Sequence, residues 1–462
     1  MANQVITFGC RLNSYESQAI KQAVADSKEN NLTVFNSCAV TAESERQLRQ
    51  AIRKAAQENP QNKIIVTGCA AQINPEKYAA MPEVTMVLGN EEKIYADNYS
   101  FSKNISGNKL KNDQNKIVNN PTAHKDRLFT QEKNLKNQSD HIFINHNMEE
   151  KIMVNDIMAV KQIHPHLITG FDDKSRAFVQ IQNGCNHRCT FCIIPYGRGN
   201  SRSVAFGQIV KQVKELVSKG YKEIVLTGVD ITDYGKDLIS DLTFAGMIKR
   251  LLKLVPELPR LRISSIDVAE VDNDPDFLDL IANEERFMPH LHISLQAGDD
   301  IILKRMARRH NRMQVINFCN KVRKLRDNIT FGADIIAGFP TETEAMFNNS
   351  VNLIHEAGIV FNHIFPYSPR TGTPASKMPQ INKEIRKQRA RELRKAGEIE
   401  LYKFLDGMIG TKQKIILENN FTGRCENFTT AIINNDPNLQ KGAIYTALIK
   451  SRTGDKLIAE LI

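Results

Sequence analysis

The N-terminal part of the chain repeats one pattern of apolar and polar positions. A short β-branched run, a cysteine and a helix-length stretch follow one another three times, and the runs VITFGC, TVFNSC and KIIVTGC end at Cys10, Cys38 and Cys69. The distance between successive cysteines is close to the roughly 30 residues of a strand-helix-strand unit. The pattern therefore predicts parallel strands in one open sheet, closed by a fourth strand at VTMVLGN, with the three cysteines at its carboxyl edge.

The composition changes after this first domain, which we place at residues 1–96. Asn and Lys become frequent between Asn98 and Glu150, and the apolar runs are short. We interpret residues 97–165 as a linker or insertion that is mostly disordered, because so few apolar residues cannot offset the entropy of ordering the chain. An arm that binds RNA is the alternative interpretation.

The alternation of strands and helices returns between Phe178 and Ser368. Six runs have the length and composition of strands, namely FVQIQ, EIVLTG, RLRISSI, LHISLQ, FGADIIAG and FNHIFPY. Six successive parallel units predict a partial barrel of the TIM type within residues 166–400, and such barrels carry their chemistry at the carboxyl ends of the strands. Polar or turn-forming residues stand at these ends: Thr227, Asp230, Asp267, Ser294, Gln296 and the turn from Gly338 to Pro340.

The last part of the chain has a third pattern. A charged helix is predicted from about Lys383 to Phe404, and four short alternating runs follow it, QKIILE, TTAIIN, AIYTALIK and KLIAELI. This spacing predicts a small β-barrel in residues 401–462, similar in size to OB-like barrels that bind RNA. The fold class is therefore α/β: an open parallel sheet, a partial (βα)6 barrel and a small C-terminal β-barrel.

Composition narrows the class of protein. Hydrophobic residues make up 41% and charged residues 25%, and no run approaches the roughly 18 apolar residues of a membrane span. The first residues do not resemble a secretory signal, so we expect a cytoplasmic protein whose eight cysteines are thiols or metal ligands. The net charge of +10 is compatible with an RNA partner, while the absence of Trp argues against an extended base-stacking platform.

The sequence Cys185-Asn-His-Arg-Cys189-Thr-Phe-Cys192 follows the first barrel strand. Three thiolates on one loop can hold three corners of a cubane and leave one iron open, since thiolates are the preferred ligands of iron-sulfur clusters. A zinc site that includes His187, a disulfide with a spare thiol, and inert buried cysteines are the alternatives. The spacing favours the cluster.

This motif on a partial barrel resembles the radical S-adenosylmethionine superfamily. The resemblance implies that the open iron chelates S-adenosylmethionine and that one electron from the cluster cleaves its sulfonium bond. It also implies that Phe191 packs near the adenine, that the turn of Thr227 and Gly228 receives the amino group, and that Ser294 and Gln296 contact ribose or carboxylate.

Nearly the whole chain resembles the methylthiotransferase family. The motifs that carry the resemblance are FGCRLNSYES, NSCAVT, VTGCAAQ, CNHRCTFCIIPYGRGNSRS, LTGVDITDYG, RISSID, HLHISLQAGDD and DIIAGFPTETE. It implies a second 4Fe-4S cluster on Cys10, Cys38 and Cys69, which delivers the sulfur of a CH3S group, and a C-terminal TRAM barrel. Cys319 and Cys425 fit neither trio and are interpreted as ordinary cysteines.

CRLNSYES and NSCAVT resemble the branch of this family that acts on N6-threonylcarbamoyladenosine beside the tRNA anticodon. The neighbouring branches act on N6-isopentenyladenosine in tRNA or on an aspartate of a ribosomal protein, and both stay as alternatives. A zinc-bearing RNA-binding protein is the alternative from a different class, and anaerobic iron analysis separates it from the enzyme.

We expect tRNA and an electron donor of unknown identity as partners, and no membrane. Arg198 and Arg202 near the mouth of the barrel are candidates for holding RNA phosphates. A second basic cluster after the fourth barrel strand is the other candidate, and it consists of Lys304, Arg305, Arg308, Arg309 and Arg312. Its alternative is a solvated helix face.

Overall fold

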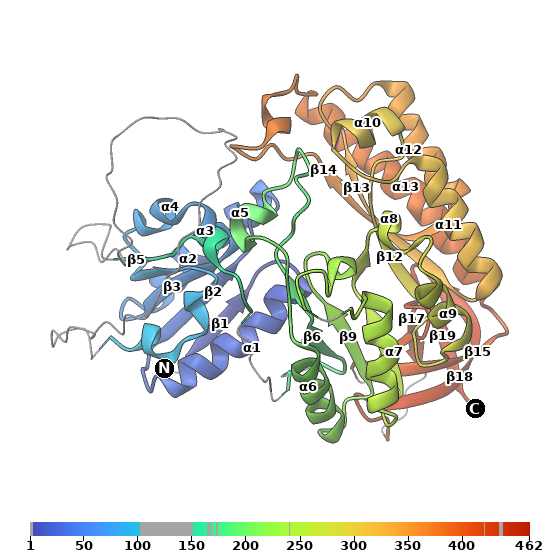
Figure 1. The fold of residues 1–462 in the computed structure, drawn as a ribbon, viewed down its shortest axis with the longest axis horizontal. Coiled ribbons are helices and arrows are strands. Elements are labelled where there is room, and N and C mark those ends of the chain that lie inside the picture. The colour runs from blue at the N-terminus through green and yellow to red at the C-terminus, as the bar shows by residue number, and fades with distance from the viewer. Residues whose placement is uncertain are drawn as a thin grey trace.

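The computed structural model describes residues 3–101 and 151–462, apart from short gaps at 164–167, 169, 172–173, 240, 420 and 434–437. Most of the linker expected at residues 97–165 therefore lies outside the described residues. Figure 1 shows three bodies along the chain: an N-terminal sheet, a larger barrel-like body, and a small barrel beside it at the C-terminus.

The N-terminal sheet has five parallel strands in the order β1-β2-β3-β4-β5. They are β1 (Gln4–Thr7), β2 (Leu32–Ser37), β3 (Lys63–Gly68), β4 (Met86–Leu88) and β5 (Ile152–Met153). The four predicted strands are confirmed. β5 was not predicted, because a strand of two residues is too short to show an alternation of apolar and polar positions. Apolar residues alternate along β2 and β3, so that Val34 and Ile65 pack on one face and Phe35 and Ile64 on the other.

Helices cover both faces of this sheet. They are α1 (Arg11–Asp26), α2 (Ala42–Glu58), α3 (Cys69–Ile73) and α4 (Pro75–Ala79), followed by the 3-10 turns η1 (Glu92–Ile94) and η2 (Ala96–Tyr99). Thr41 caps α2, because its hydroxyl accepts the N–H of Ser44 at 3.1 Å. The buried face of α1 includes Tyr15, which packs into the core of the barrel-like body, so α1 joins the two bodies.

The barrel-like body contains all six predicted strands. The first sheet has the order β10-β9-β6 and the second the order β11-β12-β13-β14, with every neighbour parallel. The strands are β6 (Ala177–Gln180), β9 (Glu223–Thr227), β10 (Arg260–Ile263), β11 (Ser265–Ile266), β12 (His290–Gln296), β13 (Thr330–Ala337) and β14 (Ile359–Pro366). Only Ser264 separates β10 from β11, so one predicted strand serves both sheets and the two sheets form an incomplete barrel wall.

Amphipathic helices pack on the outside of this wall. They are α6 (Phe206–Ser218), α7 (Phe244–Leu254), α8 (Val268–Val271), α9 (Pro275–Asn283), α10 (Asp300–Arg305), α11 (Arg312–Leu325) and α12 (Glu344–Glu356). On β12, Leu291, Ile293 and Leu295 belong to the core that the wall forms with these helices. The alternate residues of β12, from His290 to Gln296, therefore face the lumen.

The C-terminal barrel is closed in the order β15-β16-β17-β19-β18. Its strands are β15 (Lys412–Leu417), β16 (Thr422–Cys425), β17 (Thr430–Ile433), β18 (Ile444–Thr453) and β19 (Lys456–Leu461). Four were predicted, and β16 was missed because TGRC offers neither apolar alternation nor a β-branched run. The helix α13 (Lys383–Gly407) packs Leu393 into the large core and Leu405 into the small one, which ties the two bodies together.

This small barrel covers the amino-terminal end of the larger one. Arg260 and Arg262, at the start of β10, donate to the carbonyl oxygens of Lys414 and Glu426 at 2.9 and 3.0 Å. Thr330, at the start of β13, donates to the carbonyl of Asn427 at 2.7 Å. The carboxyl ends of the strands, where chemistry was expected, are consequently at the opposite end.

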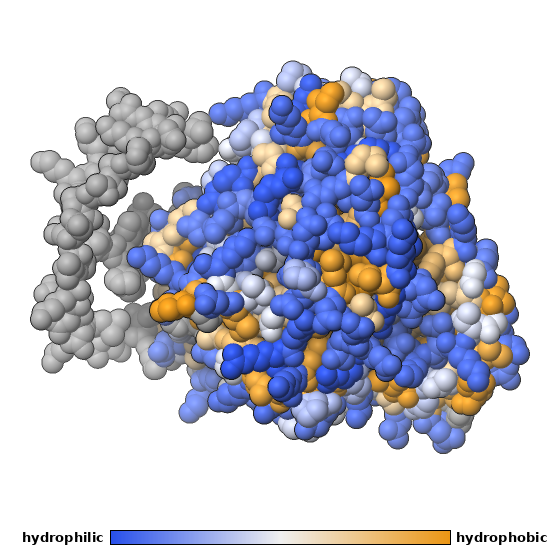
Figure 2. Space-filling view, turned by 45° about the vertical axis from the view of Figure 1, so that its right-hand side comes forward, coloured by the Kyte–Doolittle hydropathy of each residue, from blue (hydrophilic) through white to orange (hydrophobic). Residues whose placement is uncertain are grey.

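Among the described residues, no helix is long and apolar enough to cross a membrane. On the face of the molecule shown in Figure 2, hydrophilic residues predominate and hydrophobic residues form small separate patches.

Candidate functional site

The loop with Cys185, Cys189 and Cys192 connects β7 (Gln182–Asn183) to α5 (Ile194–Arg198). β7 pairs with the short strand β8 (Arg202–Ser203), and this ribbon holds the loop at the carboxyl end of β6. The N–H of Cys185 donates to the carbonyl of Gly199 at 3.1 Å, and that of Cys192 donates to Cys189 at 3.0 Å. These bonds hold the backbone of the loop at the carboxyl end of β6.

The three thiols of this loop act on one another electrostatically. Burial raises the pKa of Cys185 well above its usual range, and the charges of Asp230, Cys192 and Cys189 raise it further. Burial and Cys189 likewise raise the pKa of Cys192 to about 12. Cys185 and Cys192 therefore resist ionisation until a cation supplies positive charge, which is the behaviour of a metal-thiolate site.

A single zinc ion fits these cysteines poorly. Thiolates bound about 2.3 Å from one zinc ion must lie within about 4.6 Å of each other. Within the described part of the chain, the group of three or more possible ligand atoms that meets such a limit consists of His292, Asp334 and His363, and it contains no cysteine. The wider spacing suits a cluster that is ligated at separate corners.

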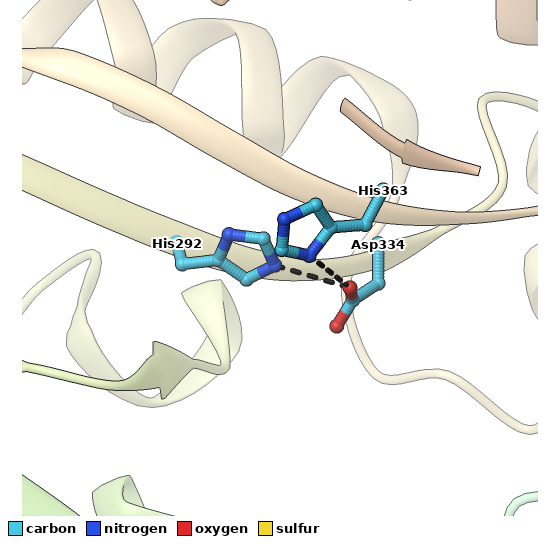
Figure 3. A group of neighbouring side chains, drawn as sticks. All are labelled: His292, Asp334 and His363. Atoms are coloured by element: carbon cyan, nitrogen blue, oxygen red, sulfur yellow. Dashed lines mark ion pairs between the residues drawn. The ribbon is translucent and has the colours of Figure 1, made fainter. Parts of the chain in front are cut away.

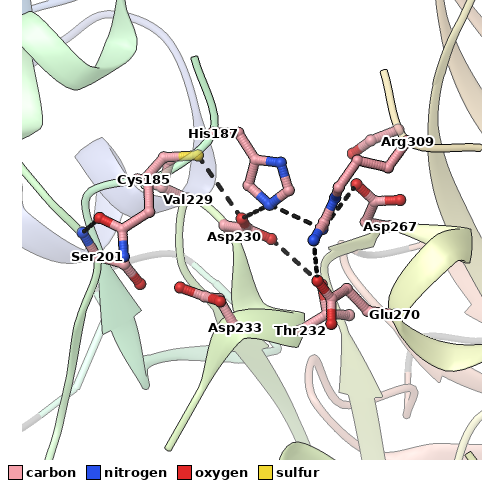
Figure 4. A network of polar contacts seen from close by, with 12 residues as sticks. Cys185, His187, Ser201, Val229, Asp230, Thr232, Asp233, Asp267, Glu270 and Arg309 are labelled. Carbon is pink, nitrogen blue, oxygen red and sulfur yellow. Dashed lines mark hydrogen bonds and ion pairs between the residues drawn. The ribbon is translucent and has the colours of Figure 1, made fainter. Parts of the chain in front are cut away.

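A polar network surrounds the cluster loop (Figure 4). Nε2 of His187 lies 3.0 Å from Oδ2 of Asp230, which is also 3.6 Å from Sγ of Cys185. Arg309 donates to Nε2 of His187 at 2.8 Å and pairs with Asp267 at 3.4 Å. His187 is therefore engaged by Asp230 and Arg309, which weakens the zinc alternative that would use it as a ligand.

Arg308 links the cluster loop to β12. Its Nη1 lies 3.6 Å from Sγ of Cys189, and its Nη2 donates to the carbonyl of Ser294 at 2.8 Å and pairs with Asp267 at 3.2 Å. The side chain is only 8% exposed. The expectation that Arg308 holds an RNA phosphate is wrong, because its donors are turned inward. Its contact with Cys189 could not be predicted, since the two residues are 119 positions apart in the chain.

The N-terminal cysteines converge because of the sheet. Cys10 stands directly before α1 and follows β1, Cys38 follows β2, and Cys69 begins α3 after β3. Burial raises the pKa of Cys38 to about 11, with further increases from the charges of Cys69 and Cys10, so the three thiols are neighbours. Gly9 has a φ of +100°, and a Cβ there would lie 2.8 Å from that of Cys38, so only glycine permits this approach.

Buried charges lie beside the N-terminal thiols. Glu16 pairs with both Arg198 and Lys93, each at 2.7 Å. Although burial alone lowers the pKa of Arg198, the charges of Cys69, Glu16 and Cys10 raise it well above its usual range. Two cations face one carboxylate, so this buried group carries an excess of positive charge beside the N-terminal cysteines.

The helix α5 connects the two cysteine sites. It starts two residues after Cys192 and ends at Arg198, whose guanidinium lies beside the N-terminal thiols. At Gly197 a Cβ would lie 3.2 Å from Cβ of Cys69, so α5 packs directly on α3. The two trios therefore stand on either side of one short helix.

The residues expected to bind S-adenosylmethionine lie around the cluster loop. The ring of Phe191 packs edge-on against Phe339 at 6.3 Å, and Thr227 is buried at the end of β9. Gly228 lies so close to Gln182 that a Cβ would be 2.8 Å from its carbonyl oxygen. Ser294 and Gln296 are half-buried on the lumen face of β12. Their roles stay predictions.

The two arginines expected to bind RNA are buried. Arg198 is 3% exposed, and its donors are taken by Glu16 and Asn13. Arg202 is 4% exposed and donates to the carbonyls of Val160 and Arg198 at 3.2 and 3.0 Å. Neither guanidinium can reach a phosphate, so this expectation is wrong; both hold the loop between the cysteine sites.

The second basic cluster is also largely occupied by protein partners. Arg305 donates to Thr341 at 2.8 Å, and Arg312 pairs with Glu356 at 2.6 Å. Lys304 is exposed on α10 and keeps its ammonium at the surface. Cys319 and Cys425, which fit neither trio, are fully buried in the large and the small core.

A polar group in the lumen was missed in the sequence. Figure 3 shows His292, Asp334 and His363, from three neighbouring strands, with both imidazoles directed at one carboxylate oxygen. The distances to Oδ1 of Asp334 are 3.1 Å from His292 and 3.3 Å from His363. The alternation in HLHISLQ was the available signal, because it places His290 and His292 on the face that carries Ser294.

Comparisons with known proteins agree with this geometry. Residues 3–89 match the family described as "Uncharacterized protein family UPF0004", and residues 179–354 match the radical SAM superfamily. The solved structure of the radical S-adenosylmethionine methyltransferase TsrM from Kitasatospora setae covers 81% of this chain and 75% of its own, with a TM-score of 0.54 and 11% identity. At that identity the likeness shows the fold alone.

Full-length relatives are more informative. The threonylcarbamoyladenosine tRNA methylthiotransferase MtaB of Rickettsia prowazekii is 50% identical over 97% of this chain and 94% of its own length. The protein of that name from Bacillus subtilis is 33% identical over 84% of this chain and 78% of its own. The cofactors implied are two 4Fe-4S clusters and S-adenosylmethionine. This chain belongs to the radical SAM methylthiotransferase family.

Proposed function

We propose that this protein transfers a CH3S group to carbon 2 of N6-threonylcarbamoyladenosine next to the anticodon of tRNA. The observation that carries the proposal is the pair of cysteine trios on either side of α5, one at the edge of each parallel sheet. A radical enzyme that only cleaves S-adenosylmethionine needs one trio. The substrate is inferred from the relatives that are named for this nucleoside.

Cys185, Cys189 and Cys192 hold the cluster that binds S-adenosylmethionine, and Cys10, Cys38 and Cys69 hold the cluster that carries sulfur. When bound, these groups supply an electron, a hydrogen-abstracting radical, sulfur and a methyl group. The protein's own residues orient them: Arg308 fixes Cys189 against β12, and the buried pair of Arg198 and Glu16 positions the N-terminal thiols. Phe191, Thr227, Gly228, Ser294 and Gln296 bind S-adenosylmethionine.

The partners follow from this activity. The substrate is tRNA, the activity belongs in the cytoplasm, and an electron donor of unknown identity reduces the barrel cluster. Isopentenyladenosine is the nearest alternative nucleoside, because the tRNA-2-methylthio-N(6)-dimethylallyladenosine synthase of Finegoldia magna is 27% identical over 92% of this chain.

The experiment is anaerobic turnover of reconstituted protein with two tRNAs, one that carries N6-threonylcarbamoyladenosine and one that carries N6-isopentenyladenosine. Nucleosides are then analysed by mass spectrometry. The proposal predicts the 2-methylthio product from the first tRNA and not from the second. Product from isopentenyladenosine alone would assign the chain to the other branch.

A further inference from the structure

Arg11, the residue after Cys10, extends from the N-terminal sulfur site into the barrel. It begins α1, which packs along β6 (Figure 1), and its Cζ lies 5.8 Å from the ring centroid of Phe428. The charges that act on it come from Arg176, Arg262 and Arg424 and, with the opposite sign, from Asp334. Its guanidinium therefore lies inside the lumen of the barrel.

Phe428 forms the floor beneath this guanidinium. The loop of the C-terminal barrel inserts the ring, which stacks on His290 at 4.6 Å and meets Phe361 edge-on at 5.7 Å. Arg424 and Arg262 also face the ring, at 4.4 and 5.1 Å. The floor is thus closed, and a group that binds here has to enter from the side of the cysteine sites.

Arg11 differs from the other arginines at the floor. Arg262 pairs with Glu223 at 2.8 Å, and Arg176 and Arg424 pair with Glu418 at 2.5 and 3.4 Å. Among the described residues, the contact of the Arg11 guanidinium is the ring of Phe428, and no carboxylate lies within ion-pair distance of it. A half-buried guanidinium without a carboxylate partner is suited to an anion from outside the protein.

The opposite wall of the lumen is polar as well. Asp334 accepts hydrogen bonds from His292 and His363 (Figure 3), and the side chain of His363 is 55% exposed. These groups satisfy one another without a metal ion, and they leave imidazole edges and a carboxylate oxygen for a neutral polar ligand. The lumen therefore offers one cationic position and one hydrogen-bonding wall.

We propose that Arg11 binds the carboxylate of the threonyl group of the substrate, with its hydroxyl and urea facing the wall of His292, Asp334 and His363; this rests on the proposed function. The adenine has to lie between the two cysteine sites for sulfur to reach it. The threonylcarbamoyl substituent of that adenine then extends into the lumen. The side chain of Arg11, the residue after Cys10, extends into the same lumen. An isopentenyl group has no charge to offset the desolvation of Arg11, so the same residue selects against it.

A purely structural role would have Arg11 brace Phe428 and nothing more. The two roles separate in a double-mutant cycle that pairs Arg11→Gln with a substrate lacking the negative charge. The second substrate is the same tRNA after its threonyl carboxylate has been coupled to methylamine. KM and kcat for methylthiolation are measured for both proteins with both tRNAs, and iron content reports on folding.

For the wild type we expect the amide to raise KM by roughly 10- to 100-fold, the loss expected for one charge-assisted contact. Arg11→Gln should raise KM for the unmodified carboxylate by a similar factor, keep kcat and iron content, and respond to the amide hardly at all. Lys219→Gln removes a positive charge from the partly exposed residue that follows α6 and should leave both values unchanged. It controls for general attraction of tRNA.

Two results would overturn the proposal: a variant as sensitive to the amide as the wild type, or a wild type indifferent to it. If Arg11→Gln loses iron, Arg11→Met, which keeps the apolar stem without the charge, carries the same cycle, and an undiminished response to the amide overturns the proposal there. Absence of product from wild type and carboxylate tRNA would instead contradict the proposed function. The two failures are therefore distinguishable.

Discussion

The two cysteine sites are built in different ways. The barrel site uses a single loop of eight residues, and the ribbon of β7 and β8 suffices to hold it. The N-terminal site takes one cysteine from each of three loops, and it depends on the register of three strands, on Gly9 and on a buried group of charges. A site built from a single loop is expected to tolerate substitutions in other parts of the chain. A site built from three loops loses its geometry when the strands that carry the loops shift. The comparison predicts that substitutions remote from the cysteines damage the N-terminal site first.

Glu16→Gln should have the largest effect. It leaves Arg198 and Lys93 buried without their carboxylate, and breaking a buried ion pair costs about 3–5 kcal/mol. We expect a much lower melting temperature and loss of about four of the about eight iron atoms per chain, all from the N-terminal site. Retention of all iron would show that the charge group is dispensable there.

The pH dependence of the same group has a definite sign. Despite burial, Arg198 and Lys93 hold the pKa of Glu16 down at about 2, below its usual 4.5. The stabilisation is therefore present above pH 4.5 and is lost as the pH falls from 4.5 toward 2. Circular dichroism of the iron-free protein in acid should show this loss for the wild type and a weaker one for Glu16→Gln.

Gly9→Ala should have an intermediate effect. Its positive φ and the 2.8 Å approach to Cβ of Cys38 make an added methyl group cost about 1–3 kcal/mol. We expect reduced iron at the N-terminal site and normal cleavage of S-adenosylmethionine at the barrel site. The matched control is Gly207→Ala on α6, where nothing lies within 4 Å and stability should rise by about 0.5–1 kcal/mol. Equal behaviour of the two variants would refute the argument from crowding.

Arg370→Gln should have the smallest effect. Arg370 follows β14, pairs with Glu45 of α2 and acts electrostatically on Cys38, so it joins the rims of the two bodies. The side chains are each 13% exposed, and such a partly exposed pair contributes about 1 kcal/mol. A small fall in melting temperature with unchanged iron is expected, and a large loss of iron would give this contact a greater role than the comparison allows.

The same contrast explains what could be predicted from the sequence. Apolar periodicity predicted the strands that carry the cysteines, and the three residues of the barrel loop are adjacent enough to be recognised as a motif. Arg198 was misjudged, because a basic residue near an active-site loop has the same local sequence whether it binds phosphate or Glu16. That partner is 182 residues away in the chain, and only the packing of α5 on α1 and α3 brings the two together.

For the C-terminal barrel, too, the strands could be predicted from the sequence but the contacts with the rest of the protein could not. Its strand pattern predicts a separate small barrel in residues 401–462. In the structure it satisfies Arg260 and Arg262 and inserts Phe428 into the floor of the lumen. Deletion would expose buried charges, so a truncated protein is expected to unfold rather than to report on tRNA affinity.

The division of roles between the two sites is the central claim, and Cys38→Ala compared with Cys189→Ala tests it most directly. Both variants are reconstituted, reduced with dithionite and supplied with S-adenosylmethionine and tRNA. Chromatography measures 5'-deoxyadenosine, and mass analysis of digested tRNA measures the CH3S product.

The account predicts that Cys38→Ala still forms 5'-deoxyadenosine but transfers no CH3S, because the barrel trio is intact on another sheet. It predicts that Cys189→Ala loses both products, since a cluster without one of its three protein ligands does not stay poised for chelation. Full methylthiolation by the Cys38 variant would contradict the two-site account.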